Sequence, residues 1–215
     1  MLRELDGAPG PEVYRLLTQV VVPRPIAWVL TDAGAEAGPG AGRWNLAPFS
    51  YFMGLASDPP LVGFSVGAGR DRRTKDTLVN VRARPAHTIL LPHRGQLEAV
   101  QRTSDDLPPG VSEVVHAGLE PVAWDWPTPR LEGSRVALAC RLERCVELAP
   151  DDRQVLVVSR VHRVWLDDEV AVEDRPGSQL VDPVGLDPLA RLGTGLYAGI
   201  DAPVRPTGTA GPRPR

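Results

Sequence analysis

Residues 134–148, SRVALACRLERCVEL, and residues 154–168, QVLVVSRVHRVWLDD, are the two stretches that decide the predicted fold. The first alternates between apolar and other residues over most of its length, which is typical of a half-buried strand. The second begins as a continuous apolar run and then alternates, so it also predicts a long strand. The short APDD turn between them predicts that the two strands form an antiparallel hairpin.

Further strands and short helices are predicted upstream of this hairpin. Strands are expected at residues 19–31, entered through Pro23 and Pro25, at 43–56, with a kink at Pro48, and at 61–67 and 87–92. Helices are expected at residues 11–17, 74–83 and 95–104, and another begins the segment 112–122. About six strands without a repeated strand–helix–strand rhythm disfavour a doubly wound parallel sheet. The sequence therefore predicts a mainly β chain with inserted short α-helices, arranged as a closed antiparallel barrel with the helices outside.

The length and composition predict one folded domain. The chain has 215 residues, and its formal net charge of -3 argues against a nucleic-acid binder that relies on overall positive charge. Residues 201–215 are rich in Pro and Gly and predict a disordered tail. We therefore expect an N-terminal extension at 1–10 and the domain at 11–200. The chain shows neither the apolar segment of a signal peptide nor a run of the roughly 18 apolar residues of a membrane span, which predicts a cytoplasmic protein.

Cysteine and histidine residues offer little chemistry of their own. Cys140 and Cys145 are five apart in a predicted strand, so we expect two buried thiols on opposite faces rather than a disulfide or metal site. The four histidines are spread out: His87, His93, His116 and His162. None pairs with another at metal-ligand spacing, and nucleotide-binding and hydrolase motifs are missing. An enzyme with this sequence would take its chemistry from a cofactor.

The stretch TKDTLVN, residues 74–80, contains Lys75, the only lysine beside 23 arginines. Thr74 can act as the N-cap of the predicted helix, which places Lys75 in the first turn. A helix N-terminus favours anions because its N–H groups are free and its dipole is positive there. Lys75 is therefore predicted to hold an anionic group, the alternative being a solvated lysine on an ordinary surface helix.

Four motifs carry a resemblance to a known family. They are VVPRPIAWVLT (21–31), NLAPFSYF (45–52), SDPPLVGFSV (57–66) and KDTLVN (75–80). In order and spacing they resemble the flavin reductase-like family of FMN-binding split barrels, and the resemblance extends over about residues 12 to 198. It implies a six-stranded antiparallel split β-barrel of Greek-key type that binds FMN and forms a homodimer.

The resemblance also implies which residues contact FMN. The predicted cofactor-binding residues are Arg24, Trp28, Asn45, Ala47, Pro48, Ser50, Tyr51, Ser65, Lys75, Asp76, Thr77 and Asn80. Lys75 and Thr77 are assigned to the phosphate, Ser50 to the phosphate or ribityl chain, and Asn45 to the flavin edge. Several alternatives stay open. Arg24 either neutralises a phosphate or lies at a subunit interface, and Trp28 contacts either the flavin or the core. Ser65 binds either ligand or backbone, and Asn80 either contacts the cofactor or braces the neighbouring strand.

The implied activity is that of an NAD(P)H-dependent flavin reductase. Hydride transfer from NADH or NADPH to FMN needs two stacked rings at near-attack distance, not a catalytic triad or a metal. Reduced flavin could then serve an acceptor or a monooxygenase partner. Two alternatives remain: a flavoredoxin-like electron-transfer flavoprotein, and a non-catalytic flavin- or tetrapyrrole-binding module.

Overall fold

The computed structural model describes residues 2–34, 42–69, 73–108, 111–175, 177–201 and 203–204. One large antiparallel sheet contains β2 (Ala27–Asp32), β3 (Trp44–Phe49), β4 (Phe52–Ser57), β5 (Pro60–Gly67), β6 (Ala86–Leu90), β9 (Val136–Ala149) and β10 (Gln154–Leu166). The order across it is β3-β2-β6-β9-β10-β5-β4. The predicted mainly β, antiparallel character is therefore confirmed, but the predicted six strands are wrong, because this sheet has seven.

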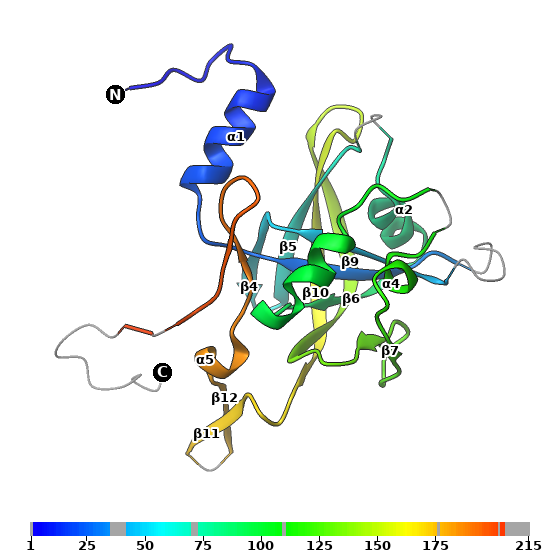
Figure 1. Ribbon diagram of the computed structural model, residues 1–215. Coiled ribbons are helices and arrows are strands. Elements are labelled where there is room, and N and C mark those ends of the chain that lie inside the picture. The colour runs from blue at the N-terminus through cyan, green and yellow to red at the C-terminus, as the bar shows by residue number, and fades with distance from the viewer. Residues whose placement is uncertain are drawn as a thin grey trace.

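Smaller elements surround the sheet (Figure 1). The helices are α1 (Gly10–Val20), α2 (Asp76–Ala83), η1 (Arg94–Gln96), α3 (Leu97–Arg102), α4 (Glu113–His116) and α5 (Pro183–Leu186). The short strands are β1 (Arg24–Pro25), β7 (Pro121–Val122), β8 (Arg130–Leu131), β11 (Ala171–Arg175), β12 (Ser178–Val181), β13 (Ala190–Arg191) and β14 (Tyr197–Ala198). Most of the predicted disordered tail, at 202 and 205–215, lies outside the described residues.

The two edges of the large sheet are joined by only two residues. β3 and β4 occupy opposite ends of the strand order, yet only Ser50 and Tyr51 separate them in the chain. The sheet must therefore curl until its edges meet at this point. No ladder pairs β3 with β4 in the described part of the chain, so the predicted closed barrel is wrong and the sheet is a curled, open one.

The break between these strands does not fall at Pro48. Pro48 lies inside β3, opposite Trp28 of β2. Because β3 is an edge strand, one of its sides has no ladder partner, and the absence of a backbone N–H at Pro48 is tolerated there. The expected kink occurs instead at Ser50 and Tyr51, where the chain leaves one edge of the sheet for the other.

Two apolar cores lie on opposite faces of the sheet. The inner core consists of Ala27, Val29, Phe49, Phe64, Val66, Leu78, Val81, Ile89, Val136, Leu138, Cys140, Val155 and Val157. The outer core consists of Ile26, Trp28, Leu30, Leu46, Leu90, Val100, Val114, Leu131, Ala137 and Leu189. Strand β2 is buried along its whole length because alternate residues enter each core. Its continuous apolar sequence follows from burial on both faces.

Strand β9 does not keep a simple alternation. Its pairing with β10 skips Glu143, so that Val158 pairs with Arg144 and Ser159 with Leu142. Such a bulge shifts the phase of the side chains beyond it. Cys140 lies in the inner core and Cys145 packs against the same core, so the prediction that they face opposite sides is wrong. Both are free thiols.

The N-terminal helix α1 stands apart from the sheet (Figure 1). It runs from Gly10 to Val20, beyond the predicted 11–17 and into the start of the segment predicted as a strand. Helices α2 and α4, in contrast, both pack against β3. No helix in the described ranges is long and apolar enough to cross a membrane.

Candidate functional site

A cavity of about 340 Å³ opens where β3, the start of α2 and the start of α4 meet. It is lined by Asn45, Ala47, Pro48, Phe49, Gly69, Arg73, Thr74, Lys75, Asp76, Thr77, Thr103, Ser104, Asp105, Asp106, Leu107 and Glu113. Six of the twelve predicted cofactor residues therefore lie together: Asn45, Ala47, Pro48, Lys75, Asp76 and Thr77. They come from two of the sequence motifs, which the curl of the sheet brings side by side.

One wall of the cavity is apolar. It is formed by Ala47, Pro48 and Phe49 of the edge strand β3. Phe49 is held in place by Phe64 of β5, with the ring centroids 5.3 Å apart. Apolar lining of this kind suits an aromatic ring system of a ligand.

The opposite side of the cavity is the N-terminus of α2. Lys75, not the predicted Thr74, is the N-cap residue, and no side chain caps the helix. The backbone carbonyl of Lys75 accepts the first helical hydrogen bonds, from the N–H groups of Leu78 and Val79. The helix start therefore keeps the uncapped N–H groups and the positive dipole end that favour an anion.

The Lys75 side chain is exposed at the cavity. Within the described residues its ammonium group has no hydrogen-bond or ion-pair partner. A compact cation with three donors and no protein partner is suited to binding an anion.

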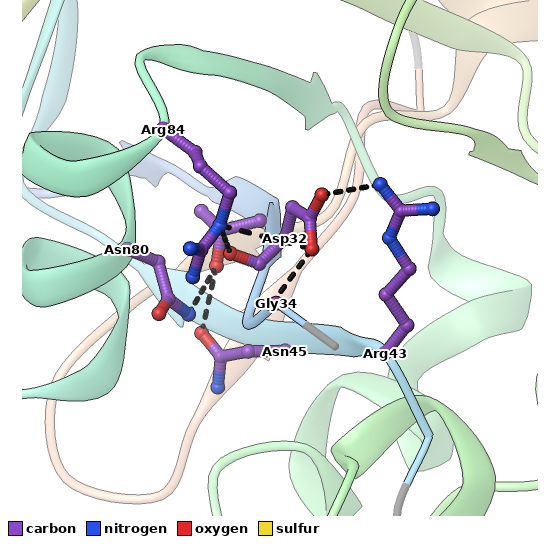
Figure 2. Close-up of polar contacts among 7 residues, drawn as sticks. Asp32, Gly34, Arg43, Asn45, Asn80 and Arg84 are labelled. Carbon is purple, nitrogen blue, oxygen red and sulfur yellow. Dashed lines mark hydrogen bonds and ion pairs between the residues drawn. The ribbon is translucent and has the colours of Figure 1, made fainter. Parts of the chain in front are cut away.

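Behind the cavity wall, a buried polar network joins three elements. The Asn45 carbonyl Oδ1 accepts hydrogen bonds from the hydroxyls of Thr31 and Thr77, both at 3.1 Å. The Asn80 amide donates to Thr31 Oγ1 at 3.0 Å. Figure 2 shows the Asn45 and Asn80 side chains turned toward one another from β3 and α2. The Asn45 amide Nδ2 lies 3.0 and 2.9 Å from the two carboxylate oxygens of Glu113.

Glu113 is a lining residue that the sequence motifs did not single out. It is the first residue of α4, and its carboxylate also accepts from the backbone N–H of Leu46 at 3.0 Å. Burial raises the pKa of the Glu113 carboxyl above its usual value, while these donors act in the opposite direction. The signal present in the sequence was Ser112 before it, which acts as the N-cap and donates to the Trp44 carbonyl. That signal predicts a helix start, not a contact with β3.

A second charged group secures the ends of the connection between β2 and β3 (Figure 2). Arg43 Nη2 donates to Asp32 Oδ2 at 2.6 Å, and the Gly34 N–H donates to Asp32 Oδ1 at 2.8 Å. The hydrogen bond from Arg43 is the main reason that the pKa of Asp32 is lowered. Arg84, which follows α2, donates to the Asp32 backbone carbonyl at 2.8 Å. Residues 35–41 of this connection lie outside the described part.

The other six predicted residues lie outside the cavity lining. Arg24 is buried and donates to the carbonyls of Thr18, Val21 and Leu192, so it joins the end of α1 to β13. Ser50 accepts a long 3.5 Å contact from Arg24 Nε.

Tyr51 presents its ring to the Arg24 guanidinium at 5.9 Å. Trp28 has no exposed surface, belongs to the outer core, and donates through Nε1 to Thr103 Oγ1 at 2.8 Å. Ser65 accepts a hydrogen bond from Gln154 Nε2. Asn80 is buried in the polar network described above.

The charges around the cavity are not evenly spread. Arg73 and Lys75 supply positive charge at the start of α2, where Thr74 adds a hydroxyl and Asp76 adds one opposing negative charge. Glu113 and the pair Asp105 and Asp106 supply negative charge on the side of α4 and of the segment after α3. An anionic ligand group is therefore favoured at the α2 end. The described residues contain no group of three or more His, Cys, Asp or Glu side chains that could hold a metal ion.

The protein is thus a mainly β one, with a curled, open antiparallel sheet and a cavity between its edge strand β3 and the N-terminus of α2. Comparison with known proteins gives the family: the chain belongs to the flavin reductase like domain family, whose model matches residues 20–183. The resemblance of the sequence motifs is thereby confirmed. This membership places the chain among the flavin-binding oxidoreductases.

Individual proteins are similar to this chain over most of its length. The chain is 35% identical to an uncharacterized protein of Halalkalibacterium halodurans over 193 residues, which cover 89% of this chain and 88% of that protein. The crystal structure of nitrilotriacetate monooxygenase component B from Bacillus cereus is 26% identical, with a TM-score of 0.82 over 95% of this chain and 98% of that one. A putative flavin reductase with a split barrel domain from Shewanella frigidimarina, 20% identical, has the same fold, with a TM-score of 0.76 over 95% and 96% of the chains.

Proposed function

We propose that this protein is an NAD(P)H-dependent flavin reductase that binds FMN in the cavity between β3 and α2. The observation that carries the proposal is the pairing of Lys75, which has no partner among the residues that the structure describes, and an uncapped helix start with an apolar wall. FMN needs both, because it joins a doubly charged phosphate to a flat ring system. The cavity volume of about 340 Å³ falls within the usual range for small-molecule sites.

The residues that would hold FMN divide between its two ends. Lys75, Thr74 and the first N–H groups of α2 would bind the phosphate. Ala47, Pro48 and Phe49 would lie against the ring system and exclude water from one of its faces. When bound, FMN supplies the capacity to accept a hydride and to release electrons. The part of the chain itself is to bind and orient the reactants, and the nicotinamide nucleotide would enter from the open side of the cavity.

Delivery of reduced flavin to a monooxygenase is part of the proposal. It is supported by the 26% identity to a protein that is itself named as a monooxygenase component. A protein in this role has to release or transfer its flavin, which suits a cavity at the surface better than a closed interior site.

We also propose that the protein is a homodimer. Helix α1 exposes Tyr14 (62%), Leu17 (38%) and Val20 (62%), and the edge strand β4 exposes Met53 (55%) and Leu55 (41%). Strand β1, which follows α1 in the chain, lies against β4. Exposed apolar groups on an edge strand and an isolated helix are typical of surfaces that another chain covers.

The activity is tested by anaerobic mixing of the FMN-loaded protein with NADH or with NADPH. We expect the visible absorbance of the oxidised flavin to bleach with at least one of the two nucleotides. The control is a parallel sample of free FMN without protein, which should not bleach at the same rate. If neither nucleotide bleaches a flavin that is demonstrably bound, the reductase proposal is wrong and an electron carrier with another donor is favoured. If the protein takes up no FMN, a site for FMN is wrong as well.

A further inference from the structure

The hydrogen bonds of the buried network behind the cavity all run in one direction, from donor to acceptor toward the same carboxylate. Asn80 donates to Thr31, Thr31 donates to the Asn45 carbonyl, and the Asn45 amide donates to Glu113. Every donor therefore points toward Glu113, the one group among these that, when ionised, can only accept. A second donor group, the backbone N–H of Leu46, reaches the same carboxylate at 3.0 Å.

This direction fixes the Asn45 side chain. An ionised Glu113 requires the NH₂ group of Asn45 to face it, so the carbonyl oxygen must face the other way. On that side it accepts from the hydroxyls of Thr31 and Thr77 at 3.1 Å each. The reverse orientation would place a carbonyl oxygen against a carboxylate, with no proton between them.

Thr77 connects this hydrogen-bond network to the cavity. It lies in the first turn of α2, lines the cavity and is 1% exposed. A threonine hydroxyl has only one proton to donate. Because that proton is given to Asn45, Thr77 cannot also donate it to an anion at the start of α2.

We propose that Glu113 is a positioning residue which, through Asn45, turns the Thr77 hydroxyl proton away from the ligand and leaves the anion to Thr74, Lys75 and the helix N–H groups. Glu113 is also a negative charge in the wall of the same cavity. Both effects weaken binding of an anionic group and leave an uncharged part of the ligand untouched. This inference deepens the proposed function and rests on it for the identity of the ligand. A moderate affinity for the phosphate suits a protein that has to release its flavin.

The test compares FMN with riboflavin, which lacks the phosphate. In Glu113→Gln the charge is removed, and Asn45 can reverse to accept from the new amide, which frees the Thr77 proton. We expect this variant to bind FMN several-fold more tightly than wild type, with riboflavin binding unchanged. The measurement is the ratio of the two dissociation constants from fluorescence titration. The exposed Glu98→Gln on α3 is the matched control and should leave the ratio at the wild-type value.

A reciprocal exchange tests the direction of the network without any ligand. Asn45→Asp alone sets two carboxylates face to face and should lower the melting temperature. Adding Glu113→Gln relieves this repulsion, since the new carboxylate at position 45 can accept from both threonines and from the NH₂ group of the new amide. The double variant should therefore melt above Asn45→Asp and return the FMN-to-riboflavin ratio to the wild-type value or below it.

Two results would overturn the proposal. One is an unchanged or lowered preference for FMN in a folded Glu113→Gln variant. The other is a double variant that melts no higher than Asn45→Asp, which would show that the network has no preferred direction. If wild type binds neither flavin, the proposed function fails, and the melting temperatures still decide whether Glu113 orders the network.

Discussion

The polar side chains around the cavity differ in whether their hydrogen-bonding groups are already used. Asn45 has its carbonyl and its amide engaged by protein groups, whereas Lys75 has no partner within the described residues. The sequence predicted the place of Lys75 because a helix start is a local signal. It could not predict the role of Asn45, because its partner Glu113 is 68 residues away in the chain. Asn45 therefore stays predicted as a cavity residue, with no free polar group for the flavin edge.

Lys75 is expected to contribute directly to FMN affinity. Replacement by alanine should weaken FMN binding by about 1–3 kcal/mol, the range for a hydrogen bond to a charged group. Lys75→Arg should recover only part of the loss, because the guanidinium is a planar fork rather than a compact charge. Fluorescence titration of the folded variants measures both effects. The exposed Arg15→Ala on α1 is the control, and equal affinity of Lys75→Ala and wild type would return Lys75 to a solvated surface role.

His87 is expected to make the protein sensitive to mild acid. It has no exposed surface, its Nδ1 lies 3.0 Å from the Pro85 carbonyl and its Nε2 2.9 Å from Ser159 Oγ. Burial lowers the pKa of His87 to about 4, from the usual 6.5. Between pH 4 and pH 6.5, His87 is therefore protonated in the unfolded chain but neutral in the folded protein. The free energy of unfolding should fall by about 3 kcal/mol as the pH drops through that window.

The measurement is urea unfolding of wild type and of His87→Gln at a series of pH values across the window. The glutamine variant starts from a different stability, but it should lack this part of the pH dependence. The raised pKa of Glu113 contributes with the opposite sign, and that contribution is common to both proteins. Equal pH dependence in the two would show that His87 is protonated in the folded state.

At the scale of elements, the junction between α1 and the sheet depends on one buried side chain. The Arg24 guanidinium donates to the carbonyls of Thr18 and Val21 at the end of α1 and, at 2.8 Å, to Leu192 beside β13. Thr18 and Val21 lie at the C-terminal end of α1, where a helix leaves carbonyl groups without intrahelical donors. Arg24 therefore ties together segments from the two ends of the domain.

Arg24→Ala should lower the free energy of unfolding by about 1–3 kcal/mol, because it removes the donor of the buried Thr18 carbonyl and of two partly buried carbonyls. Arg24→Lys should restore only part of this, since an ammonium group cannot match the spread of the guanidinium donors. Chemical denaturation measures the change, and limited proteolysis should show faster cleavage near the end of α1. If Arg24→Ala unfolds like wild type but binds FMN poorly, the alternative that Arg24 neutralises the phosphate is favoured.

The long strands and the helix α2 could be predicted because apolar periodicity acts locally, although the predicted N-cap of α2, Thr74, was wrong. The predicted positions of breaks and side chains differ from the observed ones where pairing with a strand distant in the sequence determines the structure. The break expected at Pro48 occurs at Ser50 and Tyr51, because the edge position of β3 tolerates the proline. The bulge at Glu143 in β9 is set by pairing with β10 and changes the face on which Cys145 lies. No local pattern in the sequence carries that information.

At the scale of the whole molecule, the number and order of the strands in the sheet could not be predicted from the sequence patterns. The stretch 43–56 read as a single kinked strand, whereas its two halves belong to opposite edges of the sheet. Edge pairing depends on which strand ends up beside which, and periodicity says nothing about that. The cavity itself follows from this topology, because it lies between the β3 edge and α2.

The proposed homodimer gives a prediction at this scale. Light scattering should report a mass of twice 23.2 kDa. The pair of changes Tyr14→Asp and Leu17→Asp introduces charge on the exposed face of α1 and should shift the mass toward the monomer. Val164→Asp, on an exposed position of β10, is the control and should leave the dimer intact. A monomeric wild type would contradict the proposal and leave the apolar residues of α1 and β4 to another partner.

The two-residue link at Ser50 and Tyr51 has a consequence for how this protein could be re-engineered. A connection this short leaves the chain almost no freedom, so the separation of the β3 and β4 edges is set covalently. Residues inserted there would loosen that restraint, and the entropy cost of closing the longer loop grows only slowly with its length. The separation of the two edges could thus be adjusted at this one connection, without replacing a residue of either core or of the cavity lining.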